Sequence, residues 1–151
     1  WGLSEISKPL GFDQTLAPGQ FEQSYVLRVE FEENTLTGDA EMFASFRAQL
    51  QAHPKLGLGG PSLRWLNASL REMHRLSNAP TPATPCITFI GTKEMIIDPV
   101  RVRDRMANWS NSLLRVIEGG RHEMLMDKPS MRSAIFDETT AFFDTHLAKA
   151  A

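Results

Sequence analysis

Two short apolar runs alternate with two helix-like stretches in the C-terminal part of the chain. The first run, Cys86–Ile90, is followed by a stretch of helical periodicity from Pro99 to about Trp109. The second run, Leu113–Ile117, is followed by a longer helical stretch, Pro129–Leu147. Apolar runs of this length are typical of strands buried on both faces, and their alternation with helices is typical of a parallel sheet. The chain is therefore predicted to have an α/β fold.

Two strands are too few to complete such a sheet. A parallel pair leaves an unpaired edge on each side and cannot bury both of its faces. We therefore expect this part of the chain to be the end of a larger doubly wound sheet. The sequence starts at Trp1 rather than Met, which we interpret as a cut in a longer protein. Exposed strand edges predict that the chain alone forms homo-oligomers or aggregates.

The segment before the strands carries the pattern of two amphipathic helices. Asp39 is placed to cap the first helix, whose apolar positions recur at helical spacing as far as Leu50, and Pro54 ends it. A glycine-rich bend then leads to Pro61, which is expected in the first turn of the second helix.

The chain is predicted to consist of three parts. Residues 1–33 form an irregular lead-in, in which only residues 26–31 indicate an extended segment. Residues 34–79 form a helical segment, and residues 80–151 form the strands and helices of the α/β part. The boundary between these two lies in the Pro-rich residues 77–85, which suit neither a helix nor a central strand.

Composition and charge exclude several classes of partner. Hydrophobic residues make up 42% and charged residues 23% of the chain, as in soluble globular proteins. The formal net charge of -2 gives no basic field for nucleic acid. The single cysteine, Cys86, lies in an apolar run and cannot form an internal disulfide, which favours a reducing compartment. We expect a cytoplasmic protein, with peripheral membrane association as the alternative.

The loops after the two predicted strands contain one carboxylate and one imidazole. Glu94 follows the first strand and His122 follows the second. Catalytic groups gather beyond the carboxyl ends of parallel strands, so these side chains are expected to converge. A carboxylate that accepts the Nδ1 proton of an imidazole holds the tautomer that a general base requires. An acid followed by a histidine is the order of the α/β-hydrolase triad, whose nucleophile comes earlier in the chain.

Three segments resemble the lysophospholipase and monoacylglycerol-lipase branch of the α/β-hydrolase superfamily. Residues 90–99 (IGTKEMIIDP) resemble its strand and acid loop, 119–127 (GGRHEMLMD) its histidine loop, and 58–67 (LGGPSLRWLN) its cap segment. The resemblance covers roughly residues 34–147. It implies the C-terminal part of an α/β-hydrolase, with the last two parallel strands and their flanking helices preceded by a helical cap. It also implies a serine-type ester hydrolase that acts on monoacyl lipids.

Two residues compete for the role of triad acid. The family most often has Asp at the position that corresponds to Glu94 in this chain. Asp98 is the alternative, but it directly precedes Pro99, where an aspartate is suited to cap the following helix. We therefore prefer Glu94 as the acid that orients His122, the general base, and keep Asp98 as the alternative.

The nucleophile of such a triad is absent from the chain. No Gly-x-Ser-x-Gly occurs, and the nearest candidate, Ser62, lacks the second glycine and a preceding strand. We expect the serine and the oxyanion hole upstream of Trp1, in the missing N-terminal half, so that the full-length protein is an enzyme and the chain alone is inactive. The alternative is a non-catalytic binding or interaction module on a truncated α/β-hydrolase fold.

The predicted cap helices offer candidate substrate-binding residues. The resemblance implies an acyl-chain site to which four apolar residues contribute, and their packing against one another is the alternative. These residues are Phe43, Phe46, Trp65 and Leu66. No cofactor is expected, and no metal either, because Met126 stands where the zinc-protease motif that begins at His122 requires a second histidine. The expected ligand is a lipid or another small ester.

Overall fold

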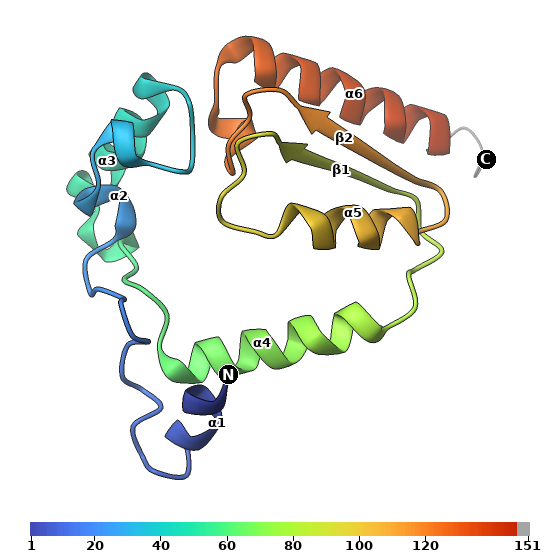
Figure 1. Ribbon diagram of the computed structural model, residues 1–151. Coiled ribbons are helices and arrows are strands. Elements are labelled where there is room, and N and C mark those ends of the chain that lie inside the picture. Colours follow the sequence, from blue (N-terminus) through green and yellow to red (C-terminus); the bar gives the residue numbers. More distant parts are fainter. Residues whose placement is uncertain (148–151) are drawn as a thin grey trace. The chain divides into compact units, whose positions relative to one another are not determined.

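The computed structural model describes residues 1–147, which divide into two compact units (Figure 1). The first unit comprises residues 1–30 and 45–80, and the second comprises residues 31–44 and the chain from residue 81 onward. Helix α3 (Ala40–Ala52) has residues in both units. The predicted acid and the predicted histidine both belong to the second unit.

The second unit is built on a parallel pair of strands. Strands β1 (Cys86–Gly91) and β2 (Ser112–Ile117) are joined by helix α5 (Pro99–Ala107), and helix α6 (Pro129–Leu147) follows β2. The strands end level with each other, with Gly91 opposite Ile117. Figure 1 shows α5 and α6 on opposite sides of this pair. The predicted α/β fold and its order of elements are confirmed.

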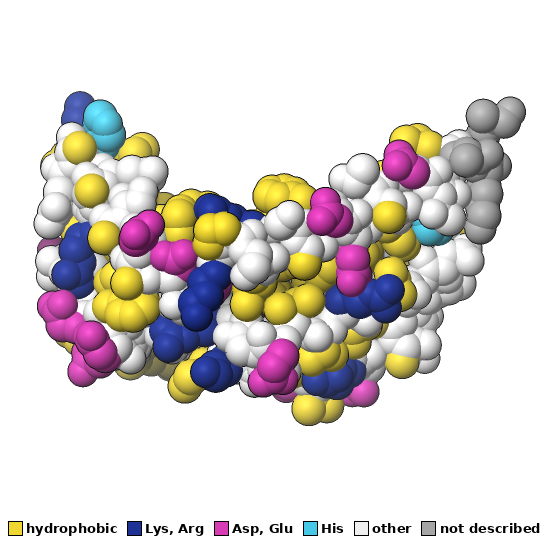
Figure 2. Space-filling model, turned by 90° about the horizontal axis from the view of Figure 1, so that it is seen from above, with side chains coloured by type: hydrophobic (Ala, Val, Ile, Leu, Met, Phe, Trp, Pro, Cys, Tyr) yellow, Lys and Arg dark blue, Asp and Glu magenta, His cyan; other side chains and the backbone are white. Residues whose placement is uncertain are grey.

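The core of the second unit is small. Its most deeply buried apolar side chains are at most 6% exposed, and they are Phe43, Ile90, Met106 and Ile135. By contrast, Phe136 and Phe143 on α6 are 55% and 57% exposed, and hydrophobic side chains are visible on the surface (Figure 2). Among residues 1–147 each strand of the pair has only the other as its partner, so each keeps one unpaired edge. This is the pattern of the end of a larger sheet.

Helices dominate the first unit. It contains α1 (Gly2–Ser7), α2 (Tyr25–Arg28), the 3-10 turn η2 (Pro54–Leu56) and α4 (Leu63–Asn78), and α1 packs on α4. Two further 3-10 turns, η1 (Phe31–Glu33) and η3 (Met124–Met126), lie in the second unit. Within the described residues, no helix combines the length and the apolar character that crossing a bilayer requires.

The first predicted helix of the helical segment is confirmed, whereas the start of the second is wrong. The Asp39 carboxylate caps α3 by accepting the amides of Glu41 at 2.9 Å and Met42 at 3.1 Å. Helix α4 begins at Leu63 and is capped by Ser62, so Pro61 lies before the helix. Pro61 is held in extended chain because its carbonyl accepts the amide of Ala17 at 2.9 Å.

The extended segment predicted for residues 26–31 is also wrong. These residues contribute to helix α2 and to the turn η1. The Arg47 side chain explains the difference, because it donates to the carbonyls of Val26 and Val29 and fixes a bend there. Such a tertiary contact overrides the weak strand preference of the valines.

Candidate active site

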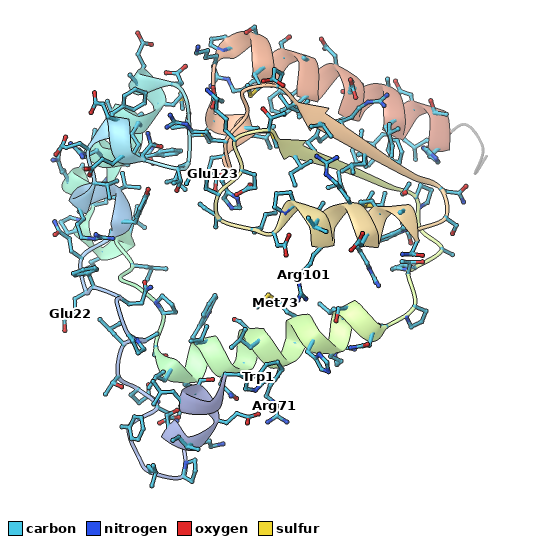
Figure 3. All side chains as sticks on the ribbon, viewed as in Figure 1. Trp1, Glu22, Arg71, Met73, Arg101 and Glu123 are labelled. Carbon is cyan, nitrogen blue, oxygen red and sulfur yellow. The ribbon has the colours of Figure 1, made fainter. Side chains whose placement is uncertain are left out.

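The loops after β1 and β2 bring Glu94 and His122 into direct contact. The Nδ1 atom of His122 lies 2.8 Å from Oε2 of Glu94. The Glu94 side chain is 3% exposed, whereas the His122 side chain is 30% exposed. A buried carboxylate thus holds an imidazole that solvent or a ligand can reach. Figure 3 labels Glu123, which follows the histidine in the same loop.

Both carboxylate oxygens of Glu94 have hydrogen-bond partners. Oε1 accepts the backbone amides of Ile96 at 2.6 Å and Ile97 at 3.2 Å, which leaves Oε2 for His122. Burial by itself raises the pKa of Glu94, but the Ile96 amide, the His122 imidazole and the Ile97 amide together outweigh burial and lower it. Glu94 is therefore held as a carboxylate, the form that can accept the Nδ1 proton.

The lowered pKa of Glu94 predicts a pH-dependent contribution to stability. A group whose pKa is lower in the folded state stabilises the fold above its unfolded pKa and loses that contribution as pH falls through the folded pKa. We expect the free energy of unfolding of the wild type to exceed that of Glu94→Gln most near neutral pH. The difference should shrink below about pH 4.3, as measured by urea unfolding from about pH 7 to about pH 3. A difference that stays constant over this range would contradict the assignment.

Two glycines allow the two loops to approach each other. A Cβ added to Gly91 would overlap the backbone carbonyl of Gly120. The loops are also joined by hydrogen bonds, from the Lys93 amide to the Gly120 carbonyl at 2.9 Å and from the Gly119 amide to the Thr92 hydroxyl at 2.8 Å. Gly119 has a φ of 73°, which a residue with a side chain rarely adopts. The contact between acid and imidazole depends on this close approach.

Asp98 has a different place in the structure. It is the N-cap of α5, where its Oδ1 accepts the amides of Val100 at 2.9 Å and Arg101 at 3.5 Å. Its side chain is 52% exposed and also forms an ion pair with Arg101 at 3.5 Å. The structure thus brings Glu94, and not Asp98, to His122.

His122 borders an apolar pocket of about 330 Å³ within the second unit. Among the apolar residues that line it are Phe89, Met124, Leu125, Ile135 and Phe136. Within the described residues, no group of three or more histidine, cysteine or acidic side chains is arranged to hold a metal ion. The chemistry that this arrangement offers is proton transfer at the imidazole.

Comparison with known proteins finds curated relatives that are lysophospholipases. No family model matches the chain. Probable lysophospholipase L2 of Haemophilus influenzae is 28% identical over 93 residues, which are 61% of this chain and 30% of that protein. Lysophospholipase L2 of Escherichia coli K12 is 27% identical over 125 residues, which cover 77% of this chain and 36% of that protein. The chain therefore spans about a third of the length of these curated relatives.

A solved structure has a similar fold. The crystal structure of a soluble variant of monoglyceride lipase from Saccharomyces cerevisiae, in complex with a substrate analogue, superposes with a TM-score of 0.63. Its sequence is 18% identical, and the match covers 96% of this chain and 49% of the lipase chain. The chain resembles the C-terminal part of a lysophospholipase-like α/β-hydrolase. The predicted fold class is confirmed by this match.

The four candidate substrate residues of this hydrolase-like chain are divided between the two compact units. Phe43 is 3% exposed and contacts Phe31 in the second unit, with ring centroids 5.9 Å apart. Phe46, Trp65 and Leu66 belong to the first unit, where Trp65 is 61% exposed. Phe43 is therefore occupied by packing, and an acyl-chain site on the other three stays a prediction.

Sequence reasoning missed a buried polar network behind the histidine loop. Asn34, Thr37 and Asp127 are at most 3% exposed, and hydrogen bonds connect residues 34–38 with the loop that carries His122. The sequence does show an Asn and a Thr in a short stretch before the residue that caps α3, and such side chains often form hydrogen bonds with nearby backbone. Nothing local, however, indicated a partner nearly 90 residues away.

Proposed function

We propose that the chain supplies the acid and the general base of a serine-type ester hydrolase that acts on monoacyl lipids. The observation that carries this proposal is the Glu94–His122 pair at the exits of two parallel strands, in the chain order of the α/β-hydrolase triad. The substrate class is supported by the names of the relatives, two lysophospholipases and a monoglyceride lipase. In this proposal the serine and the oxyanion hole come from sequence outside these 151 residues.

The two ring nitrogens of His122 have different roles in this proposal. Nδ1 is engaged by Glu94, which leaves Nε2 to face the reacting groups. In the first step Nε2 takes the proton of the serine hydroxyl while the serine oxygen attacks the ester carbonyl, and the protonated imidazole then passes that proton to the leaving alcohol. In the second step Nε2 takes a proton from the water that attacks the acyl-enzyme, and the imidazolium returns this proton to the serine oxygen as the fatty acid leaves. Glu94 stabilises the imidazolium in both steps.

A covalent probe of serine hydrolases tests the proposal directly. A longer protein that continues upstream of Trp1 should contain Gly-x-Ser-x-Gly after a strand and should react with a fluorophosphonate at that serine. It should also hydrolyse a lysophospholipid or a monoacylglycerol, as measured by fatty-acid release. The 151-residue chain alone should show neither reaction.

The alternative function, a non-catalytic binding or interaction module, makes the opposite prediction. It is favoured by the absence of Gly-x-Ser-x-Gly from the chain. Under this alternative the upstream sequence also lacks that motif, and the longer protein binds monoacyl lipid without releasing fatty acid.

A further inference from the structure

Asp127 is a buried carboxylate that the proposed mechanism does not use. It is 1% exposed, and its Oδ2 accepts the Gly38 amide at 2.6 Å and the Thr37 hydroxyl at 3.3 Å. Its Oδ1 accepts the amide of Lys128 at 2.8 Å. Within residues 1–147 no lysine or arginine side chain forms an ion pair with it, so neutral donors alone offset the loss of hydration. Burying a carboxylate without a cationic partner costs free energy, so the position of Asp127 needs a structural or functional explanation.

The partners of Asp127 belong to residues 34–38, which we term the anchor segment. This segment contacts the histidine loop along its whole length. The amide of His122 donates to the Thr35 carbonyl at 3.4 Å, and the amide of Glu123 donates to the Leu36 carbonyl at 2.7 Å. Before the histidine, Nη1 of Arg121 donates to the carbonyls of Asn34 at 2.7 Å and Thr37 at 3.0 Å.

The anchor segment is itself held in shape by buried side chains. Oδ1 of Asn34 accepts the amides of Leu36 and Thr37, both at 3.0 Å. The Thr37 hydroxyl has one proton, which it shares between the Met126 carbonyl at 2.8 Å and, more weakly, Oδ2 of Asp127 at 3.3 Å. Arg121 thus binds the segment at Asn34 and Thr37, and Asp127 binds it at Thr37 and Gly38.

Such fixation matters because the histidine loop starts with two glycines. Gly120 allows the close approach to β1 and Gly119 adopts a φ of 73°, but both glycines also give the loop backbone freedom that would let the imidazole move. A general base must be held within about 0.5 Å of its productive position by packing and hydrogen bonds around it. The hydrogen bonds to the anchor segment restrict the backbone of the histidine loop, which the two glycines alone would leave flexible.

We propose that Asp127 is a positioning residue for His122 and acts through the anchor segment, an assignment that rests on the proposed function of His122. Within residues 1–147 no hydrogen bond or ion pair joins Asp127 to the imidazole or to Glu94. Its carboxylate fixes Thr37 and Gly38, and the segment in turn fixes the backbone of His122 and Glu123. Loss of the side-chain oxygen that accepts the Gly38 amide therefore loosens the contact between Glu94 and the imidazole without removing either group.

The test is NMR spectroscopy of the labelled 151-residue chain, with the His122 ring as the probe. In the wild type the Nδ1 proton between His122 and Glu94 should exchange slowly with water. In Asp127→Ala and in Thr37→Val we expect its exchange to be at least about tenfold faster, because the anchor segment is released. Asp127→Asn should retain slow exchange, since its amide oxygen can still accept the Gly38 amide.

Two controls separate positioning from a general loss of structure. His146, whose Nδ1 lies 2.7 Å from the Phe142 carbonyl, is in the same unit, and its ring signals should not move in any of the variants. Asp104→Ala, a change of an exposed acid on α5, should leave the His122 proton unaffected. If Asp127→Ala fails to fold, Thr37→Val decides the question. Wild-type exchange of the His122 proton in folded Thr37→Val would overturn the proposal.

An activity measurement distinguishes failure of this proposal from failure of the proposed function. In the longer protein, Asp127→Ala should lower kcat for a monoacyl ester by roughly 10²-fold, the effect of a misplaced reacting group, with KM little changed. If the wild type releases no fatty acid while the NMR results are as expected, the proposed function fails and the positioning role stands. If the wild type is active and Asp127→Ala retains its full kcat, the positioning role fails.

Discussion

Replacing His122 by Ala in the longer protein should lower kcat for a monoacyl ester by roughly 10²- to 10⁴-fold, because the serine loses its general base. The measurement is steady-state release of fatty acid, with the fraction of folded protein checked by circular dichroism. His146→Ala is the matched control, since the interactions described for its ring are with the Phe142 carbonyl and ring and not with the loop that carries His122. Ordinary turnover by the His122 variant would show that the base has been assigned wrongly.

The same experiment resolves the two candidate acids. Glu94→Gln leaves an amide beside His122 that favours the wrong tautomer of the imidazole, so we expect kcat to fall by up to roughly 10⁴-fold. Asp98→Asn keeps an oxygen at the helix N-cap and should change the free energy of unfolding by less than about 1 kcal/mol, with kcat retained. The opposite pattern would assign the acid to Asp98.

Replacing Gly91 by Ala should destabilise the chain by about 3 kcal/mol or more, at the upper end of the effect of overpacking. The added methyl would overlap backbone atoms of Gly120, which cannot move aside as the end of a flexible side chain can. We expect a lower midpoint of urea unfolding and, in the longer protein, loss of hydrolysis because the two loops separate. The measurement is the unfolding midpoint at neutral pH.

Gly2 offers the control for this substitution. A Cβ added there meets no atom within 4 Å, so Gly2→Ala should leave the unfolding midpoint nearly unchanged. An unfolding midpoint in Gly91→Ala equal to that of Gly2→Ala would contradict the close packing of the two strand exits.

The elements that the sequence predicted well are those with strong local signals. The limits of β1, β2 and α6 follow from apolar runs and prolines, and the observed bounds differ from the predicted ones by at most one residue. The convergence of Glu94 and His122 followed from a general property of parallel sheets, because both residues come directly after a strand. Fold and candidate pair could therefore be predicted without a structure.

Other features depend on contacts between distant residues and could not be predicted. The bend at residues 26–31 is fixed by Arg47, and the delayed start of α4 reflects the pairing of Pro61 with Ala17. Likewise, Asp127 ends the segment that resembles the family's histidine loop, but nothing in the sequence predicts its burial against Thr37. Local patterns carry no information on which of many polar residues will meet in the folded chain.

The hydrogen bonds of Glu94 have a consequence for the choice between the two acidic amino acids. One oxygen meets the amides of Ile96 and Ile97 and the other meets His122, so the side chain spans the distance from its own turn to the imidazole. An aspartate on the same backbone is one methylene shorter, so it would lose either its hydrogen bonds to the amides of Ile96 and Ile97 or its contact with the His122 ring. Exchange between the two acids during evolution therefore requires a compensating change in the length or path of the loop.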